Sequence, residues 1–453
     1  MSIRQCGLCP YAAFAVSAIP EGLNMHLALN HFWVDPARGG AETYVCDLCR
    51  RLVEDGHEVD LYAYKWNAQA LPRQVRVIAV AAPGLTSAGR AWRFAANSAA
   101  ALGAASYDCT IGFINTWFHD VIIPQAGVRA ASIEHNALRF APGWRRDLYH
   151  LGKRANPKHW VYQAIERKQY EPANAMRVIA PSQMVQRHLE RYHHLSRERI
   201  RVIPNAIDAS RLEVADPASA RADLGRKLGL AESDLVALFV GHNFWLKGLK
   251  PLLNALAWRQ QQKPGARPIH LLACGGGRVS PFRAMVDQLG LSGQVHLLGF
   301  VPDVRACFWA SDFFVLPTYY DPCSLVVFEA LACGLPVITT SYNGAGELIH
   351  DGREGYVIPT PDARSDLAYV MERMTDDKAR KEMSAHATRL GRAQSFEHHY
   401  ARVLDVLKEV AEAKRSRRHL RGQAGQTDRQ PGPHTEAVTP ASAGGTREER
   451  VRS

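Results

Sequence analysis

The sequence lacks the marks of a secreted or membrane-spanning protein. Its nine cysteines are an odd number and no convincing secretory signal precedes them, so a disulfide framework is not expected. Residues 1–24 hold one weak, interrupted apolar run that is too short to span a bilayer. We therefore expect a cytoplasmic protein in which residues 1–24 are a loose extension and the folded chain begins near Met25. A poor signal peptide is the alternative interpretation of the first segment.

The sequence also lacks the spacings of two common sites. Its two Cys-x-x-Cys pairs, at positions 6/9 and 46/49, are separated by a distance that fits no common zinc module. Cys49 shares a helical face with Val45 and Leu52, which predicts packing rather than metal binding. No Gly-x-Gly-x-x-Gly turn follows the first predicted strand, where VDPARGGAE stands instead, and this disfavours a nicotinamide-dependent dehydrogenase.

What the chain does have is length and positive charge. A chain of 453 residues exceeds one ordinary core and predicts two globular domains. The formal net charge of +11 indicates phosphate-bearing partners, which are nucleic acid, acidic lipid or an anionic substrate. Part of this charge lies in residues 415–453, which are polar, rich in Pro, Gly and Ser and nearly free of large apolar side chains. We expect this segment to be a disordered basic tail.

Short apolar runs alternate with helical patterns along the rest of the chain, as they do in parallel α/β sheets. The pattern begins with MHLALNHF and starts again with LVALFVGHN, after a Pro-containing joint near Pro204. It predicts two doubly wound domains, 25–205 and 206–395, that face each other across a cleft at the carboxyl ends of their strands. A last helix, 396–414, is apolar on one face and must dock on the folded part.

The stretch DPCSLVVFE places two acids, Asp321 and Glu329, around a nearly apolar run. The positions of its proline and glycine residues predict a strand that ends near Pro317, a turn that holds Asp321, and a helix that stops at Gly334. The N–H groups at the start of such a helix attract anions and sugar oxygens, and Glu329 would reach the same cleft. The alternative is an N-cap Asp followed by a solvated helix Glu. The N–H groups concerned belong to Cys323, Ser324 and Leu325.

This stretch resembles the acid-x7-acid motif of the retaining glycosyltransferase family 4 enzymes, which have the GT-B fold. Other segments resemble the same family in the same order: GGAETYV, APSQMVQRHL, IRVIPNAID, FVGHNFWLKGLKPLLNAL, LGFVPDV and GREGYVI. The most similar branch is that of the lipopolysaccharide core α-1,3-glucosyltransferases, which share the short VGxxFxxKG spacing. The resemblance implies two Rossmann-like domains, of which the first binds the acceptor and the second the nucleotide sugar, with the C-terminal helix crossing back to the first.

The resemblance also implies roles for three residues of the second domain. Glu329 matches the acid that binds the ribose hydroxyls, and Lys247 matches the base that neutralises the donor diphosphate as its charge grows. Asp321 stands where the family normally has a Glu that contacts the transferred sugar, so its reach is shorter, and Pro322 removes one N–H beside it. For Lys247, a surface lysine at a helix start is the alternative.

Further roles follow from the resemblance with less support from the residues themselves. Most relatives place a second cation near the lysine, and Arg211 in IDASRL is the candidate for it here. Gly39 and Gly40 match the Gly-Gly loop that lets backbone approach the donor phosphate. His119 and His135 are the first-domain candidates for a group that handles the acceptor proton. His119 is favoured as a sugar contact, with an ordinary packed histidine as the alternative. Backbone atoms around Phe300 and Val301 are expected to read the base of the nucleotide.

Asp-x-Asp is absent from the sequence, which disfavours the metal-clamped diphosphate of the other main glycosyltransferase type. We predict a metal-independent enzyme without a cofactor, whose donor substrate is a nucleotide sugar with UDP-glucose as first choice. In such enzymes the leaving phosphate itself is expected to act as the base.

Residues 139–168 interleave aromatic residues with lysines and arginines. Aromatic rings favour the bilayer interface and cations favour anionic headgroups, so we expect this segment to lie on a membrane surface. A solvated basic helical hairpin and a nucleic-acid patch are the alternatives, and we predict no nucleic-acid partner. The aromatic residues include Trp144, Tyr149, Trp160 and Tyr162, and the cations include Arg145, Arg146, Lys153, Arg154, Lys158 and Lys168.

These features predict a cytoplasmic enzyme, peripheral at the inner face of the cell membrane. It would move a hexose onto a hydroxyl of a lipid-linked or envelope glycan such as lipopolysaccharide core, with retention of configuration. The alternatives are a non-catalytic carbohydrate- or nucleotide-binding relative and a family 4 mannosyl- or other hexosyltransferase.

Overall fold

The computed structural model describes residues 24–171, 176–231 and 233–427. The loose extension predicted for residues 1–24 lies almost wholly outside the described residues, as do residues 428–453 of the predicted tail. The described residues up to Ala411 form one compact unit, and residues 412–427 belong to a second.

The first sheet begins at the start of the described chain, where MHLALN forms the strand β1. Among the described residues this sheet has seven parallel strands in the order β5-β3-β1-β6-β7-β8-β9. The strands are β1 (His26–Asn30), β3 (Glu58–Ala63), β5 (Arg76–Ala79), β6 (Cys109–Gly112), β7 (Val121–Ile122), β8 (Arg177–Ala180) and β9 (Ile200–Val202). A small pair, β2 (Trp33–Val34) and β4 (Lys65–Trp66), lies outside it. The connecting helices are α1 (Gly40–Glu54), α2 (Ser87–Gly103), α3 (Arg129–Ala137), α4 (Trp144–Ala155), α5 (Pro157–Gln169) and α6 (Gln183–His193).

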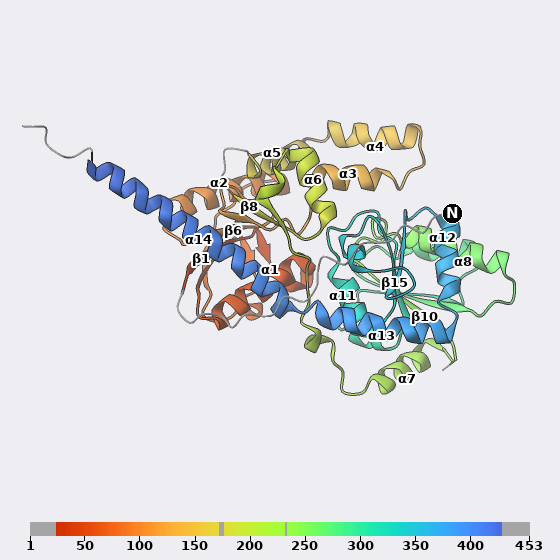
Figure 1. Cartoon of the computed structure of the whole chain (residues 1–453). Coiled ribbons are helices and arrows are strands. Elements are labelled where there is room, and N and C mark those ends of the chain that lie inside the picture. Colours follow the sequence, from red (N-terminus) through yellow and green to blue (C-terminus); the bar gives the residue numbers. More distant parts are fainter. Residues whose placement is uncertain (1–23, 172–175, 232, 428–453) are drawn as a thin grey trace, which may run out of the picture. The chain divides into compact units, whose positions relative to one another are not determined.

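The second sheet repeats this organisation with six parallel strands among the described residues, in the order β12-β11-β10-β13-β14-β15. The strands are β10 (Leu235–Val240), β11 (Ile269–Cys274), β12 (Val295–Gly299), β13 (Phe313–Leu316), β14 (Val337–Thr340) and β15 (Gly355–Ile358). The helices are α7 (Pro217–Leu228), α8 (Leu249–Gln262), α9 (Ser280–Gln288), α10 (Arg305–Trp309), α11 (Leu325–Ala332), α12 (Arg364–Arg373) and α13 (Asp377–Ala393) (Figure 1).

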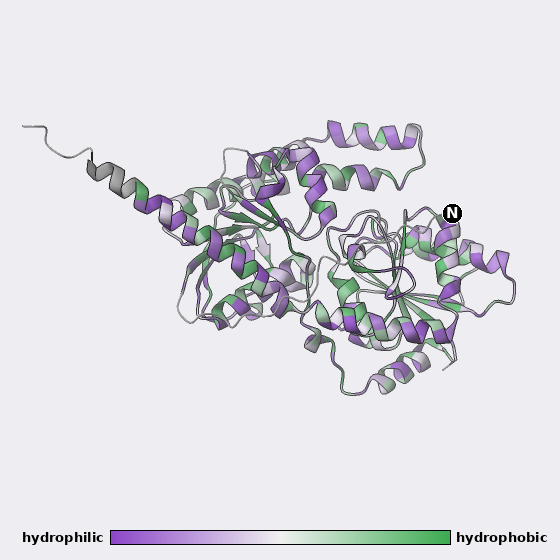
Figure 2. Cartoon of the chain, viewed as in Figure 1, coloured by the Kyte–Doolittle hydropathy of each residue, from purple (hydrophilic) through white to green (hydrophobic). Residues whose placement is uncertain are grey.

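The strands form because their residues are apolar without a break. The run LVALFV of β10 is buried along nearly its whole length, since helices cover both faces of a parallel sheet. Figure 2 shows hydrophobic strands and helices whose outward residues are hydrophilic. The predicted fold, two doubly wound α/β domains, is confirmed. The predicted boundary between residues 205 and 206 falls between the two sheets and remains a prediction.

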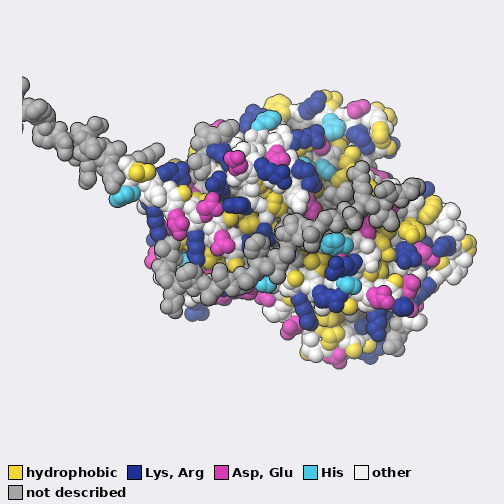
Figure 3. All heavy atoms as spheres, in the orientation of Figure 1, with side chains coloured by type: hydrophobic (Ala, Val, Ile, Leu, Met, Phe, Trp, Pro, Cys, Tyr) yellow, Lys and Arg dark blue, Asp and Glu magenta, His cyan; other side chains and the backbone are white. Residues whose placement is uncertain are grey.

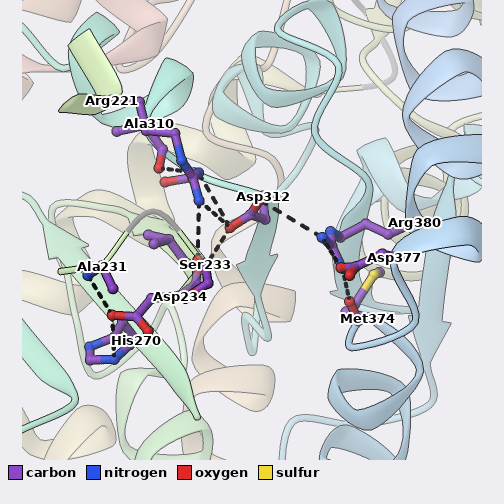
Figure 4. A network of polar contacts seen from close by, with 12 residues as sticks. Arg221, Ala231, Ser233, Asp234, His270, Ala310, Asp312, Met374, Asp377 and Arg380 are labelled. Atoms are coloured by element: carbon purple, nitrogen blue, oxygen red, sulfur yellow. Dashed lines mark hydrogen bonds and ion pairs between the residues drawn. The ribbon is translucent and has the colours of Figure 1, made fainter. Parts of the chain in front are cut away.

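A polar network holds the amino end of β13, away from the carboxyl ends where ligands of such sheets bind. Asp312, which precedes this strand, accepts a hydrogen bond from the backbone N–H of Val236 at 2.7 Å. Its carboxylate also meets Arg221 of α7 at 3.4 Å and Arg380 of α13 at 3.9 Å (Figure 4). The network therefore joins α7 and α13 to the amino end of β13. The loops at the carboxyl ends of the strands take no part in it.

The C-terminal helix α14 (Phe396–Thr427) packs its apolar face into the core of the first sheet. The hydroxyl of Tyr44 lies 2.9 Å from Nε2 of His399, and Nδ1 of that histidine lies 2.8 Å from the carbonyl oxygen of Pro204. These contacts join the first turn of α14 to the first domain. The buried face includes Phe396, Tyr400, Val403, Leu404 and Leu407.

One expectation about this helix is wrong. We expected disorder from residue 415, but α14 continues to Thr427. Residues 415–427 contain no proline, and lengthening an established helix costs far less than starting one. Among the described residues, no helix is both long and apolar enough to cross a membrane.

Candidate active site

The loop after β13 carries the acidic motif, and backbone hydrogen bonds fix its course. The N–H of Asp321 donates to the carbonyl of Tyr342 at 2.9 Å, and the carbonyl of Asp321 accepts from the N–H of Gly344 at 2.9 Å. The loop is thereby joined to the segment that follows β14. Asp321 is 7% exposed and its side chain forms an ion pair with Nζ of Lys247. The structure therefore brings together the acid and the base that the sequence proposes for the donor site.

Lys247 reaches this position because the residue after it is glycine. Gly248 has φ of +84°, and a Cβ atom there would lie 1.9 Å from the carbonyl oxygen of Pro317. Only a residue without a side chain permits the loop after β10 to approach the end of β13 so closely. The backbone N–H of Lys247 donates to the carbonyl of Asn243 at 2.8 Å. The Lys-Gly pair thus places the ammonium group over the acidic loop.

Glu329 lies on the second turn of α11, and its side chain is partly buried, without a hydrogen-bond or ionic partner among the described residues. Burial raises the pKa of its carboxyl group to about 7. A desolvated carboxylate with no cation beside it is ready to accept hydrogen bonds from hydroxyl groups, which favour its charged form. This is the chemistry that a ribose diol requires.

The start of α11 meets the Gly-Gly loop of the first domain. A Cβ atom on Gly40 would lie 2.9 Å from Cδ1 of Leu325, so the N-termini of α1 and α11 approach each other. Of the three N–H groups proposed for anion binding, that of Ser324 donates to Oδ1 of Asn343 at 3.3 Å. Those of Cys323 and Leu325 have no partner among the described residues. Gly39 precedes α1 with φ of +155°, in a conformation that side chains disfavour.

Two family models match this chain. The one described as Glycosyltransferase Family 4 covers residues 38–211, and the one described as Glycosyl transferases group 1 covers residues 221–390. The chain is 24% identical over 368 residues to the lipopolysaccharide glucosyltransferase WaaG of Escherichia coli (strain K12), a match that covers 81% of this chain and 92% of WaaG. It is 28% identical over 399 residues to the D-inositol 3-phosphate glycosyltransferase of Nocardioides sp., covering 81% of this chain and 84% of that protein.

Solved structures share the fold. The crystal structure of WaaG matches with a TM-score of 0.70 at 22% identity, over 84% of this chain and 99% of WaaG. That of Anabaena HepE in complex with UDP-glucose matches with a TM-score of 0.61 at 19% identity, over 87% of this chain and all of HepE. The chain belongs to glycosyltransferase family 4.

The two histidines that are candidates for handling the acceptor proton, His119 and His135, occupy different surroundings. His119 is 4% exposed, lies with its Nε2 3.2 Å from the amide nitrogen of Asn30, and has a pKa lowered to about 4 by burial. His135 lies with Nδ1 3.0 Å from the carbonyl oxygen of Tyr319, two residues before Asp321. Burial also lowers the pKa of His135. His135 thus contacts the motif loop directly, whereas His119 stands neutral at the carboxyl ends of β1 and β6.

Arg211 and Val301 are not brought to the Lys247 and Asp321 pair by any contact among the described residues. Arg211 forms an ion pair with Asp47 of α1 at 2.7 Å and another with Asp208 at 3.3 Å. Two carboxylates thus already pair with the guanidinium group of Arg211. The ion pair with Asp47 joins the segment between the domains to α1. Val301 follows β12 and packs against the core of the second domain. Their roles toward the donor remain predictions.

Several residues that position the site were missed by the sequence analysis. The hydroxyl of Tyr320 accepts a hydrogen bond from the N–H of Val128 at 3.0 Å. The hydroxyl of Ser182 donates to the carbonyl of Pro322 at 2.7 Å. Glu347 accepts the N–H of Gln183 at 2.8 Å and so caps α6 of the first domain from the second. Spacing along the chain carries no signal for partners this distant.

The segment 139–168 forms two helices, α4 and α5, rather than one continuous element. Its tryptophans are exposed, Trp144 by 70% and Trp160 by 57%, beside the exposed Leu148 and Leu151. Figure 3 shows hydrophobic and basic side chains intermingled over α4. An open groove of about 610 Å³ runs between the loop 139–145 and a strip of the second domain that includes Trp245 and Lys250. The described residues contain no cluster of three metal-ligating side chains.

Proposed function

We propose that this glycosyltransferase moves a hexose, with glucose from UDP-glucose as first choice, onto a hydroxyl of a lipid-linked or cell-envelope glycan such as lipopolysaccharide core. Transfer would retain the anomeric configuration and would need no metal. One observation carries the proposal: the Lys247 ammonium and the Asp321 carboxylate meet beside the start of α11, whose second turn carries the unpartnered Glu329. This arrangement suits a sugar nucleotide, whose diphosphate is anionic and whose two sugars carry hydroxyl groups.

Each of the three side chains then has a task that its surroundings favour. Lys247 stabilises the negative charge that gathers on the departing diphosphate, so its effect is largest in the transition state. Glu329 accepts hydrogen bonds from the ribose diol. Asp321 orients the transferred hexose after Lys247 exchanges its carboxylate for the diphosphate. The leaving phosphate receives the acceptor proton.

The donor and acceptor classes rest on similarity and on surface chemistry. WaaG is named a lipopolysaccharide glucosyltransferase, and HepE was solved with UDP-glucose. The exposed tryptophans and leucines of α4 and α5, set among lysines and arginines, fit a protein that lies on an anionic membrane. We therefore place the enzyme at the inner face of the cell membrane.

The test is release of UDP from UDP-glucose by the purified protein, followed by transfer into an acceptor-lipid extract. We expect both reactions in the absence of divalent ions and in the presence of a chelator. Asp321→Glu should keep or raise the transfer rate, because the longer arm restores the family's usual reach. A protein that binds UDP-glucose but neither hydrolyses nor transfers glucose would instead be a non-catalytic relative.

A further inference from the structure

The first domain holds a second cavity, of about 240 Å³, beside the loop after β7. Three helices supply one basic side chain each to its wall: Arg129 from α3, Lys153 from α4 and His159 from α5. Among the described residues that line it, Glu166 is the only acid. Convergence of three basic groups from separate helices is a property of the fold rather than of one helix face.

The guanidinium of Arg129 has no hydrogen bond or ion pair among the described residues. Its nearest ring is that of Tyr162, whose centroid lies 4.5 Å away. Glu166, the nearby acid, instead accepts the backbone N–H of Arg129 at 2.9 Å. Burial lowers the pKa of Arg129. Glu166 is thus a nearby acid that does not pair directly with the guanidinium, and it is one negative group among three basic ones, so the cavity favours an anionic occupant.

The other two basic groups form no ion pair with an acid among the described residues. Nζ of Lys153 lies 3.0 Å from Nε2 of His159, so the ammonium group donates a hydrogen bond to the neutral imidazole. Burial and the neighbouring cations lower the pKa of both groups. This hydrogen bond does not neutralise the charge of Lys153, and an anion beside Lys153 in the cavity would do so.

Polar atoms without partners gather in the same place. Oδ1 of Asn136, the hydroxyl of Tyr149 and Nδ1 of His159 are buried and have no hydrogen-bond partner among the described residues, and all three residues line the cavity. Buried polar groups are normally paired, so three orphans around one cavity indicate that a polar group belongs inside it. The hydroxyl of Tyr149 and the Nδ1–H of His159 can donate to an oxyanion, whereas Oδ1 of Asn136 can accept from a hydroxyl group of the same ligand.

The cavity borders the catalytic loop. A Cβ atom on Gly127, which lines the cavity, would lie 2.2 Å from the hydroxyl of Tyr320 and 2.9 Å from Cγ of Pro322, the neighbours of Asp321. A group held in the cavity therefore lies next to the loop that is expected to hold the transferred sugar. The volume is below that of a pocket for a whole small-molecule ligand, about 300 to 1,000 Å³, and suits one charged substituent.

We propose that this cavity binds a phosphate monoester carried by the acceptor glycan, and that Arg129 and Lys153 select phosphorylated over unphosphorylated acceptors. The inference rests on the proposed function for its acceptor, whereas the anion site itself is independent of it. Donors arranged around the cavity suit a tetrahedral dianion. The phosphate of a lipid headgroup has the same chemistry, and the experiment separates the two sources.

The experiment titrates the full-length protein with inorganic phosphate and with glucose 6-phosphate by calorimetry. Each titration is repeated in Lys247→Ala, where the proposed donor-phosphate site is disabled. We expect binding in both proteins, at least tenfold weaker in Arg129→Gln and Lys153→Met. The exposed Arg167 of α5 lies outside the cavity lining, so Arg167→Gln is the matched control and should bind as the parent does.

Tyr149→Phe separates an effect on phosphate binding from an effect on protein stability. Loss of an unpartnered hydroxyl should leave thermal stability unchanged or higher in phosphate-free buffer, yet weaken phosphate binding. Binding of glucose 6-phosphate that Arg129→Gln and Tyr149→Phe leave unchanged would overturn the proposal. It would also be overturned if phosphatidic acid vesicles bound in an Arg129-dependent manner while glucose 6-phosphate did not bind. UDP release from UDP-glucose, measured separately, should persist in Arg129→Gln, so failure of the donor reaction is distinguishable from failure of this site.

Discussion

The carboxyl group of Glu329 has no hydrogen-bond or ionic partner among the described residues, and we expect it to lower the free energy of unfolding of the protein. This loss of stability would be the consequence of keeping the group unpaired for the proposed donor. In the unfolded chain the pKa of this group has its ordinary value of 4.5, whereas burial in the folded protein raises the pKa to about 7. Between these values the unfolded state holds fewer protons than the folded state. The free energy of unfolding therefore falls as pH rises through this window, and the full penalty is present above pH 7.

The size of the penalty follows from the difference between the two pKa values. A pKa difference of one corresponds to about 1.4 kcal/mol, so the penalty grows from nearly zero at pH 4 to about 3 kcal/mol at pH 8. Glu329→Gln keeps the shape of the side chain and removes its charge. The variant should thus match the parent near pH 4 and exceed its unfolding free energy by up to about 3 kcal/mol at pH 8.

Urea unfolding, followed by tryptophan fluorescence at several values between pH 4 and pH 8, measures this difference. The same variant should lose affinity for UDP-glucose, because an amide is a weaker acceptor for a diol than a carboxylate is. Adding UDP should raise the parent's midpoint more than the variant's. A gain in stability that does not depend on pH, or no gain at pH 8, would refute the idea that a desolvated, unpaired carboxylate occupies this position.

Three further predictions concern the proposed donor site and the proposed membrane surface of α4. Lys247→Ala should lower the rate of UDP release by about 10²- to 10³-fold, the usual cost of removing one charge-stabilising group, whereas Lys227→Ala on the exposed face of α7 should not change it. Gly248→Ala should abolish donor binding in a titration with UDP, because its Cβ would lie 1.9 Å from a carbonyl oxygen. The control is Gly265→Ala, since Gly265 has the same φ of +84° but open space around it. This control should lower the free energy of unfolding by only about 1 kcal/mol in a melting experiment. Trp144→Ala should weaken flotation with anionic vesicles and leave hydrolysis of UDP-glucose unchanged, and equal flotation of parent and variant would count against a membrane role for α4.

The parts of the site that the sequence predicts are those built by local rules. Asp321 and Glu329 belong to one strand-turn-helix unit, whose bounds follow from an apolar run, a turn proline and a helix-stopping glycine. Lys247 joins them because β10 and β13 are hydrogen-bonded neighbours in the second sheet, so the loops after them meet at one edge. Periodicity predicted the strand-turn-helix unit, whereas the family resemblance supplied the role of Lys247, and the strand order that explains its position is seen only in the structure.

Arg211 illustrates where such rules stop. Its role toward the donor phosphate remains a prediction, and the partners that it has in the structure are set by tertiary packing. Asp47 lies on α1, 164 residues away in the chain, and holds the guanidinium at 2.7 Å. The end of α14 shows the same limit in another form. Polar composition predicted disorder from residue 415, whereas continuation of an established helix prevailed as far as Thr427.

The contacts that no spacing rule reveals share one property: they hold the acidic loop against the first domain. Tyr320, Pro322 and Glu347 of the second domain each accept a hydrogen bond from the first, and all three lie in or beside the segments that fix Asp321. The motif that is proposed to contact the donor is therefore held in place by the domain expected to bind the acceptor. Loss of the Tyr320 hydroxyl would remove its hydrogen bond with the N–H of Val128. Because Arg129 is the next residue and lines the cavity of the first domain, this change should alter both that cavity and the loop that holds Asp321.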